Sequence, residues 1–410
     1  MKQLALRFWI AITLALPTTV VAQTVIVGTG NPDVDVPAVQ AAVDQGGEVI
    51  LRGQFSFDRP PTIPTAIPEL PLATVLVSKA VAISGTRDVS IEAGTVPFYI
   101  EAPGASVSMQ KLRFVRPTRS AILVYAVSGL TIASCRIEGV VTVPNRASTG
   151  VSIATEYAIP TPDHPGNPEN ISGRLVIANN DIDMTGGTSS DNVIGLLIFS
   201  IGISPDREVD VYVSGNNIRN VTEPAINIRR VGGRAHVESN VLITAPVSST
   251  TALRPEVIRA VNIGSYVIAH NSIECQWPDP DAVGIGVWTQ VPDWPMEHAV
   301  VVDNQVTMSP PEATVFGSFS AGIGIWGFAA DSYVANNRIR GRARAALAVD
   351  VFNGGIPANN AFVQNRFEDF EPSVADVFID TGVPDTLILG QRGTVRDQGV
   401  NTVVLPFRGR

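Results

Sequence analysis

The chain has 410 residues, of which 45% are apolar and only 16% charged, and its formal net charge at pH 7 is −9. A negative net charge disfavours nucleic acid as a partner, because the phosphate backbone is bound by clustered lysine and arginine. The 35 glycines and 30 prolines are spread along the chain, which excludes long uninterrupted helices and favours many short extended segments.

The first predicted element, over residues 1–22, is a secretory signal peptide. Lys2 and Arg7 form a basic start, an apolar segment follows from Phe8 to Val20, and small residues precede Gln23. This apolar segment is too short to span a bilayer, and no later segment is long enough. We therefore expect cleavage after Ala22, a secreted or periplasmic location, no membrane span, and one domain over residues 23–410.

A repeated asparagine motif dominates the rest of the chain. Each copy has a β-rich run, a polar pair ending in asparagine, one further residue and an aliphatic residue. The anchoring asparagines are Asn180, Asn217, Asn240, Asn271, Asn304, Asn337 and Asn365. Two degenerate copies precede them, at 107–114 and 130–137, with Gln110 and Cys135 at the asparagine position. Asparagine suits a turn because it tolerates left-handed backbone and its amide can bond an equivalent amide one coil away.

A second strand precedes each anchor and has apolar residues at its second and fourth positions. The copies are GVSIA (150–154), GLLIF (195–199), AINIR (225–229), AVNIG (260–264), GIGVW (284–288), GIGIW (322–326), ALAVD (346–350) and DVFID (376–380). Alternation with a period of two places both apolar positions on one face. Stacked copies then bury a continuous aliphatic core that no single repeat can bury alone.

This strand, asparagine turn and strand pattern resembles the right-handed parallel β-helix of the pectate-lyase-like superfamily. The resemblance implies an all-β solenoid of about ten coils. It also implies that residues 33–51, which contain DVPAVQAAVDQGGEVIL, form a short capping helix, a Gly-Gly turn and the first strand. The cap would cover the open edge of the solenoid, and the terminal coil is expected over about residues 376–406.

Cys135 and Cys275 are expected to be free thiols. The repeat places them four coils apart, which is roughly 19 Å at about 4.8 Å per coil. A disulfide requires α-carbons within about 7 Å.

The resemblance implies that substrates lie along the first sheet, which the GIGVW-type strands form. On its outward face, Trp288 and Trp326 occupy equivalent positions on neighbouring coils, each beside a glycine, so their rings are candidates to stack on sugars. The alternative is an aromatic ladder covered by the loop at 291–298. The outward positions also make Arg229, Asn227 and Asn262 candidate substrate-binding residues.

Asp350 and Asp380 are the candidate catalytic carboxylates, since they are equivalent residues one coil apart and thus about 5 Å from each other. That separation suits the two carboxyl groups of a retaining glycosidase. Alternatively, Asp350, Asp380 and Glu368 are candidate calcium ligands, and Arg344 is the candidate base of a lyase. The remaining alternative is a solvated carboxylate face.

The catalytic signatures of the superfamily are absent from the sequence, and His270 in VIAHN is expected to be a turn residue. We therefore expect a monomer that binds an extended acidic polysaccharide along the first sheet. Whether it also cleaves this polymer, as a lyase or as a hydrolase, is left open. The alternative function is non-catalytic adhesion at a surface or matrix. Calcium is the one candidate cofactor.

Overall fold

In the computed structural model the described residues are 23–65, 72–142, 147–154, 171–185, 188, 191–199, 209–248, 255–289 and 298–405. The predicted signal peptide and its cleavage site lie outside the described residues, as do residues 291–297 of the expected covering loop. No helix among the described residues is both long and apolar enough to cross a membrane.

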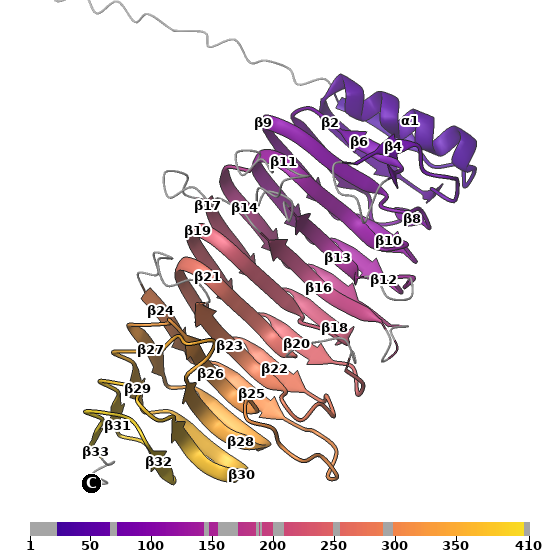
Figure 1. Cartoon of the computed structure of the whole chain (residues 1–410). Coiled ribbons are helices and arrows are strands. Elements are labelled where there is room, and N and C mark those ends of the chain that lie inside the picture. The colour runs from indigo at the N-terminus through magenta and orange to yellow at the C-terminus, as the bar shows by residue number, and fades with distance from the viewer. Residues whose placement is uncertain are drawn as a thin grey trace, which may run out of the picture.

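The predicted cap is present at one end of the molecule (Figure 1). Helix α1 (Pro32–Gln45) begins with a proline, and the side chain of Asn31 accepts from the N–H of Asp33, so an early backbone donor of the helix is satisfied. Its buried face, with Val39 and Val43, packs on the first coil. Gly46 and Gly47 have positive φ values of 75° and 80°, a conformation that favours glycine.

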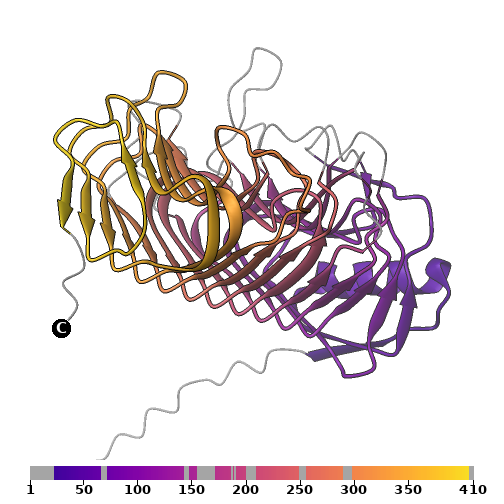
Figure 2. The same ribbon diagram turned by 90° about the horizontal axis from the view of Figure 1, so that it is seen from below.

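The rest of the chain winds through three parallel sheets that stack coil upon coil (Figures 1 and 2). The first sheet contains β6 (Val75–Val77), β13 (Ala147–Ala154), β16 (Asn192–Phe199), β23 (Val283–Thr289), β26 (Ala321–Gly327) and β32 (Val395–Asp397). The second contains β1 (Gln23–Val27), β2 (Gly47–Arg52), β7 (Val81–Gly85), β14 (Gly173–Ala178), β17 (Val209–Ser214), β24 (His298–Val302), β27 (Ser332–Ala335), β29 (Ala361–Val363), β31 (Leu387–Leu389) and β33 (Val403–Leu405).

The third sheet contains β3 (Gln54–Ser56), β8 (Ser90–Glu92), β10 (Arg113–Val115), β12 (Arg136–Glu138), β15 (Asp181–Asp183), β18 (Asn217–Val221), β20 (Val241–Thr244), β22 (Ser272–Cys275) and β25 (Gln305–Met308). Six long strands bend from one sheet into the next. The strands β9 (Phe98–Gln110), β11 (Ser120–Ala133), β19 (Ile226–Glu238) and β21 (Glu256–Ala269) join the first sheet to the second, and β28 (Arg338–Asp350) and β30 (Arg366–Ile379) join the third to the first. A separate antiparallel pair links β4 (Ile63–Pro64) to β5 (Leu72–Ala73).

The predicted aliphatic ladders form the core, with one error of register. Leu196 pairs with Ile226, as expected, but Ile226 then pairs with Ile258 and not with Val261. The first-sheet part of β21 is therefore 257–261, three residues before the predicted AVNIG. Apolar residues occupy both phases of this long strand, Ile258 and Ala260 in one and Val261 and Ile263 in the other, so the pattern alone fits either register. Asn262, at φ 50°, lies beyond the paired first-sheet residues, where β21 turns toward the second sheet.

The asparagine ladder is present, with Asn216 in place of the predicted Asn217. The sequence has two adjacent asparagines there, and Asn216 is the one whose Nδ2 donates to the Oδ1 of Asn240, at 2.9 Å. The left-handed residue of each turn is the one before the ladder asparagine, for example Gly215 at φ 64° and His270 at φ 56°. His270 is thus the predicted turn residue.

Both cysteines are free and buried, as predicted. The N–H of Cys135 donates to the Oδ1 of Asn180 at 2.9 Å, so Cys135 occupies the coil before the first ladder asparagine. Burial raises the pKa of Cys135 to about 11 and that of Cys275 to about 12.

Candidate functional site

One outward row of the first sheet carries most of the predicted site residues. Pairing between successive strands places its members in register, in the order Arg229, Val261, Trp288, Trp326 and Asp350. The next pairing joins Val349 to Ile379, which brings Asp380 beside Asp350. Paired residues of neighbouring strands lie about 5 Å apart. The predicted equivalence of the two tryptophans, and that of the two aspartates, is therefore confirmed.

The two tryptophan rings are covered and offer no open face to a sugar. Trp288 is 7% exposed and Trp326 is 1% exposed. Phe352 meets Trp288 edge-on with ring centroids 5.5 Å apart, and Phe319 meets Trp326 at 6.3 Å. The sugar-stacking prediction for these residues is wrong, because loop aromatics that the repeat does not contain pack over them.

Trp326 lies across the glycines beside it. A Cβ atom built on Gly324 would stand 2.0 Å from the Trp326 ring, and one on Gly286 would stand 3.1 Å from it. The glycines that seemed to open a sugar slot thus make room for the indole itself. The Trp326 Nε1–H donates to Asp350 Oδ2 at 3.4 Å, so this aromatic cluster connects to the carboxylates at the end of the row.

Asp350 forms a buried ion pair with Arg344. Asp350 is 4% exposed, and Arg344 Nη1 lies 3.1 Å from its Oδ2. The same guanidinium lies over the ring of Phe378 at 3.8 Å. Burial raises the pKa of Asp350 to about 6, although Arg344 opposes this shift, and neighbouring Asp380 adds to it. The three residues predicted to be catalytic are therefore brought together, with Arg344 and Asp350 already bound to each other.

The predicted calcium site is wrong. Glu368 lies in the third-sheet part of β30, where it forms ion pairs with Arg338 at 3.0 Å and with Arg340. Asp350 and Asp380 belong to the first sheet. Within the described part of the chain, no three acidic, histidine or cysteine side chains gather as they would around a metal ion. The loop between the two aspartates follows the sheet around the coil, which carries Glu368 away from both.

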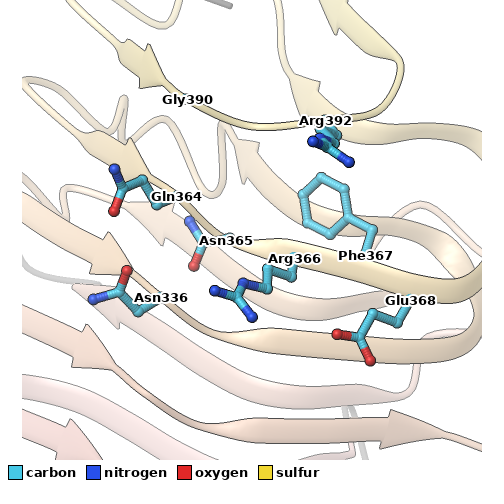
Figure 3. Close-up of a pocket in the computed structure, with 8 residues that line it drawn as sticks. All are labelled: Asn336, Gln364, Asn365, Arg366, Phe367, Glu368, Gly390 and Arg392. Atoms are coloured by element: carbon cyan, nitrogen blue, oxygen red, sulfur yellow. The ribbon is translucent and has the colours of Figure 1, made fainter. Parts of the chain in front are cut away.

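Glu368 instead borders a pocket of about 500 Å³ near the C-terminal end of the solenoid (Figure 3). Its lining comes from consecutive turns and includes Asn336, Gln364, Arg366, Phe367 and Arg392. Arg366 and Arg392 are exposed. The pocket lies at the asparagine turns and the third sheet, so it is separate from the outward row of the first sheet.

A second charged group lies at the middle of the first sheet, and we call it the central cluster: Glu223, Asn227, Arg229, Glu256 and Arg259. Asn227 is 3% exposed, and Arg229 Nε donates to its Oδ1 at 3.1 Å. Arg259 pairs in register with Asn227, so Arg259 takes the position predicted for Asn262. Asn262 itself is buried beyond the paired strand, and its assignment to the outward face is wrong.

Glu256 and Arg259 form an ion pair within the central cluster, with their side chains 1% and 8% exposed. An ion pair so far removed from water holds both side chains firmly, because separating the partners leaves a buried charge. Neither residue was predicted. The three-residue error of register at 260–264 placed both of them outside the strand.

Glu223 completes the cluster from the turn just before β19. It is 7% exposed, and among the described residues none hydrogen-bonds to its carboxyl group. Burial raises its pKa to about 7, where Arg259 and Arg229 oppose the shift while Glu256 and Asp279 add to it. A carboxyl group of this kind exchanges its proton near neutral pH. Glu223 and Glu256 each stand beside a proline just before a first-sheet strand, but in opposite order, Glu223-Pro224 and Pro255-Glu256, so no repeated motif in the sequence marks them.

The comparisons with known proteins address the fold. No family model and no curated protein sequence matches the chain. Two solved structures of PfbA, a surface adhesin of Streptococcus pneumoniae, are similar, both with a TM-score of 0.51. One is 12% identical and covers 86% of this chain and 93% of that one, and the other is 10% identical and covers 92% and 100%.

The A-module of the mannuronan C-5 epimerase AlgE4 from Azotobacter vinelandii has a TM-score of 0.46 at 12% identity, covering 92% of this chain and 98% of its own. At these identities the similarity concerns the fold. The similarity to PfbA, together with the stacked parallel sheets, the asparagine ladder and the N-terminal cap, identifies the chain as a right-handed parallel β-helix.

Proposed function

We propose that the chain binds an extended acidic polysaccharide along the outward face of the first sheet, anchored at the central cluster. The observation that carries this proposal is local positive charge. Arg229 and Arg230 lie 5.7 and 5.8 Å from the centroid of the Phe199 ring, and Arg259 lies on the next coil. Of the described residues of the central cluster, Glu223 and Glu256 are the acidic ones beside these arginines, and Asp279 lies near Glu223, in a protein whose net charge is −9.

Guanidinium groups suit this role because they bind carboxylates with two parallel hydrogen bonds. Arg229 is half-buried and is oriented by Asn227, so less side-chain entropy is lost when it meets a ligand. Arg259 forms an ion pair with Glu256. Arg229 and Arg230 lie on the preceding coil, and the stacked parallel strands offer a linear surface along which the carboxylates of a uronate chain can meet them.

The test is binding of the chain to polygalacturonate, alginate and neutral dextran, measured by calorimetry at low and at moderate salt. We expect binding to one or both polyuronates, weakened by salt, and none to dextran. The variant Arg229→Gln/Arg230→Gln should weaken binding by about tenfold or more. Arg366→Gln, at the pocket on the third sheet, is the matched control and should bind as the wild type does.

Two results would contradict the proposal. If no polyuronate binds, the adhesive alternative, to which the fold shared with PfbA lends support, replaces it. If Arg366→Gln weakens binding and the double variant does not, the ligand lies on the third sheet instead of the first.

A further inference from the structure

The outward face of the second sheet is apolar over most of its length. Its middle row is in register from coil to coil and contains Val176, Tyr212, His236, Val267, Val300, Tyr333, Ala361, Leu387 and Val403. None of these side chains is buried, and Tyr333 is 43% and Val403 is 50% exposed. Figure 1 shows β24, β27, β29, β31 and β33 of this sheet following one another along one side of the solenoid toward its C-terminal end.

A second outward row, two residues further along each strand, is also poor in charge. It contains Ala178, Ser214, Glu238, Ala269, Val302, Ala335, Val363 and Leu389. Its one charged member, Glu238, lies 3.4 Å from His236 of the middle row. The third sheet differs, since its outward residues include Arg136, Asp181, Arg219, Glu274, Arg338 and Glu368. A contiguous apolar face of this extent marks an interaction surface.

Charged side chains line one border of this face, and their sign changes along the solenoid. Arg174 and Arg234 each stand two residues before a member of the middle row, and Asp331 and Asp385 do the same nearer the C-terminal end. All four are exposed, and within the described part of the chain none of them forms an ion pair. Asp210, between the two arginines, is half-buried. The exposed border is therefore basic at one end and acidic at the other.

We propose that two copies of this chain pack through this face of the second sheet as a symmetric dimer, in place of the monomer expected from the sequence. The two solenoids run in opposite directions, and the two-fold axis lies between the coils of Val267 and Val300. This reversed order places Arg234 of one copy opposite Asp331 of the other. It also places Arg174 opposite Asp385, and the symmetry forms each contact twice.

The apolar residues that meet in this arrangement complement one another. Tyr212 meets Ala361, so a large side chain lies against a small one, and on the next coil the rings of His236 and Tyr333 meet. From β14 to β31 the face is about 34 Å long and about 16 Å wide, at about 4.8 Å between strands and about 3.3 Å per residue. Two copies then bury about 1,100 Å², which reaches the area of about 1,000 Å² expected of a specific interface.

The dimer leaves the first sheet free. The outward row at which we propose that a polysaccharide binds belongs to a different sheet from the apolar face, so this inference does not depend on the proposed function. Stacking of copies end to end is disfavoured, because α1 covers the N-terminal end of the solenoid (Figure 1).

Sedimentation velocity across a wide range of protein concentration tests the dimer. We expect an equilibrium between monomer and dimer without larger species, because a two-fold contact is closed. Val300→Glu places a charge at the centre of the face and should weaken dimerisation by about 100-fold or more. Thr307→Glu is the matched control, since Thr307 faces outward on the third sheet of the same coil, and it should dimerise as the wild type does. Circular dichroism checks that each variant is folded.

Charge reversal tests the order in which the two copies meet. Arg234→Asp alone should weaken dimerisation by about tenfold or more, because it sets acidic side chains opposite each other at two places. The double variant Arg234→Asp/Asp331→Arg should restore it. Within one copy these two residues are three coils apart, about 14 Å, so the restoration cannot come from a contact inside one chain.

Three results would overturn the inference. The first is a wild type that stays monomeric at every concentration. The second is a Val300→Glu variant that dimerises as the wild type does, which would place the contact on another face. The third is a double variant that dimerises no better than Arg234→Asp, which would exclude the reversed order of the two copies.

Discussion

Asn271 and Asn304 lie one coil apart and share a hydrogen-bonded oxygen. The Nδ2 of Asn271 donates to Asn304 Oδ1 at 2.9 Å, and the N–H of Asn271 donates to the same oxygen at 3.0 Å. Asn271 in turn accepts the same two bonds from Asn240. Each amide thus satisfies a backbone donor of the previous coil and orients the next amide. The ladder therefore fixes the register of successive coils.

Replacing Asn271 with alanine should destabilise the protein by about 3 kcal/mol, because several buried donors and acceptors lose their partners. The measurement is the urea midpoint followed by circular dichroism. Asn217→Ala is the matched control, since Asn217 lies beside the ladder and its amide only meets Asp181 at the surface of the third sheet. A shift of the midpoint as large for Asn217→Ala as for Asn271→Ala would contradict this account of the ladder.

The fold could be predicted from the sequence because each coil repeats the same local demands. A left-handed turn, a buried amide and two inward aliphatic residues recur in every coil. The fold can therefore be recognised from the other copies even where one copy is misread. The errors occur where the local pattern is degenerate. The ladder residue Asn216 could not be told from the adjacent Asn217, and apolar residues in both phases of β21 left its register undetermined. Neighbouring coils decide both cases through hydrogen bonds that a single copy does not encode.

The candidate site could be predicted only in part, because its residues come from segments outside the repeat. Asn227 and Arg229 lie on a repeated strand and were found. Glu223 belongs to the preceding turn, and Glu256 and Arg259 were hidden by the register error. The covering of Trp288 and Trp326 depends on Phe319 and Phe352, which lie in loops of irregular length. No periodicity in the sequence places such loops over the sheet.

Because Arg344 and Asp350 form a buried ion pair, the loss in free energy of unfolding on replacing Arg344 should depend on pH. Arg344→Ala should destabilise the protein by about 3 kcal/mol at pH 8, because it leaves a buried carboxylate without its partner. At pH 5 the cost should be smaller, since Asp350, whose pKa is already raised to about 6, can then take up a proton. Unfolding of Arg344→Ala, Asp350→Asn and the double variant tests this. Additive costs in the double variant would mean that the two residues do not interact.

Trp326 should contribute to stability and not to sugar binding. Trp326→Leu should lower the free energy of unfolding by about 2 kcal/mol, because a buried indole is replaced by a smaller side chain. Polyuronate binding should remain within about twofold of the wild type, in contrast to Arg229→Gln/Arg230→Gln. Calorimetry on the folded variants makes the comparison. A folded Trp326→Leu protein that no longer binds would restore the stacking role that the burial of Trp326 contradicts.

Cys135 and Cys275 should not react with thiol reagents in the folded protein. The reactive form of a thiol is the thiolate, and burial raises the pKa values of these residues to about 11 and 12. A colorimetric disulfide reagent should therefore detect no thiol at pH 8 under native conditions and both thiols in concentrated urea. If neither thiol is detected in urea without reductant, the two cysteines form a disulfide. That result would contradict the structure, in which both cysteines are free and buried.

Glu223 should make the folded protein less stable as the pH rises. Its pKa is about 7 when folded and about 4.3 when unfolded, so between these values the folded protein holds a proton that the unfolded chain releases. The stabilising contribution is complete below about pH 4 and is lost as the pH passes 7, by roughly 4 kcal/mol in all. The wild type should thus have a lower urea midpoint at pH 8 than at pH 5. Glu223→Gln should remove much of this difference and Glu274→Gln none. If all three proteins lose stability equally, the Glu223 carboxyl group is not the source of the pH dependence, and a group such as Asp350 accounts for it.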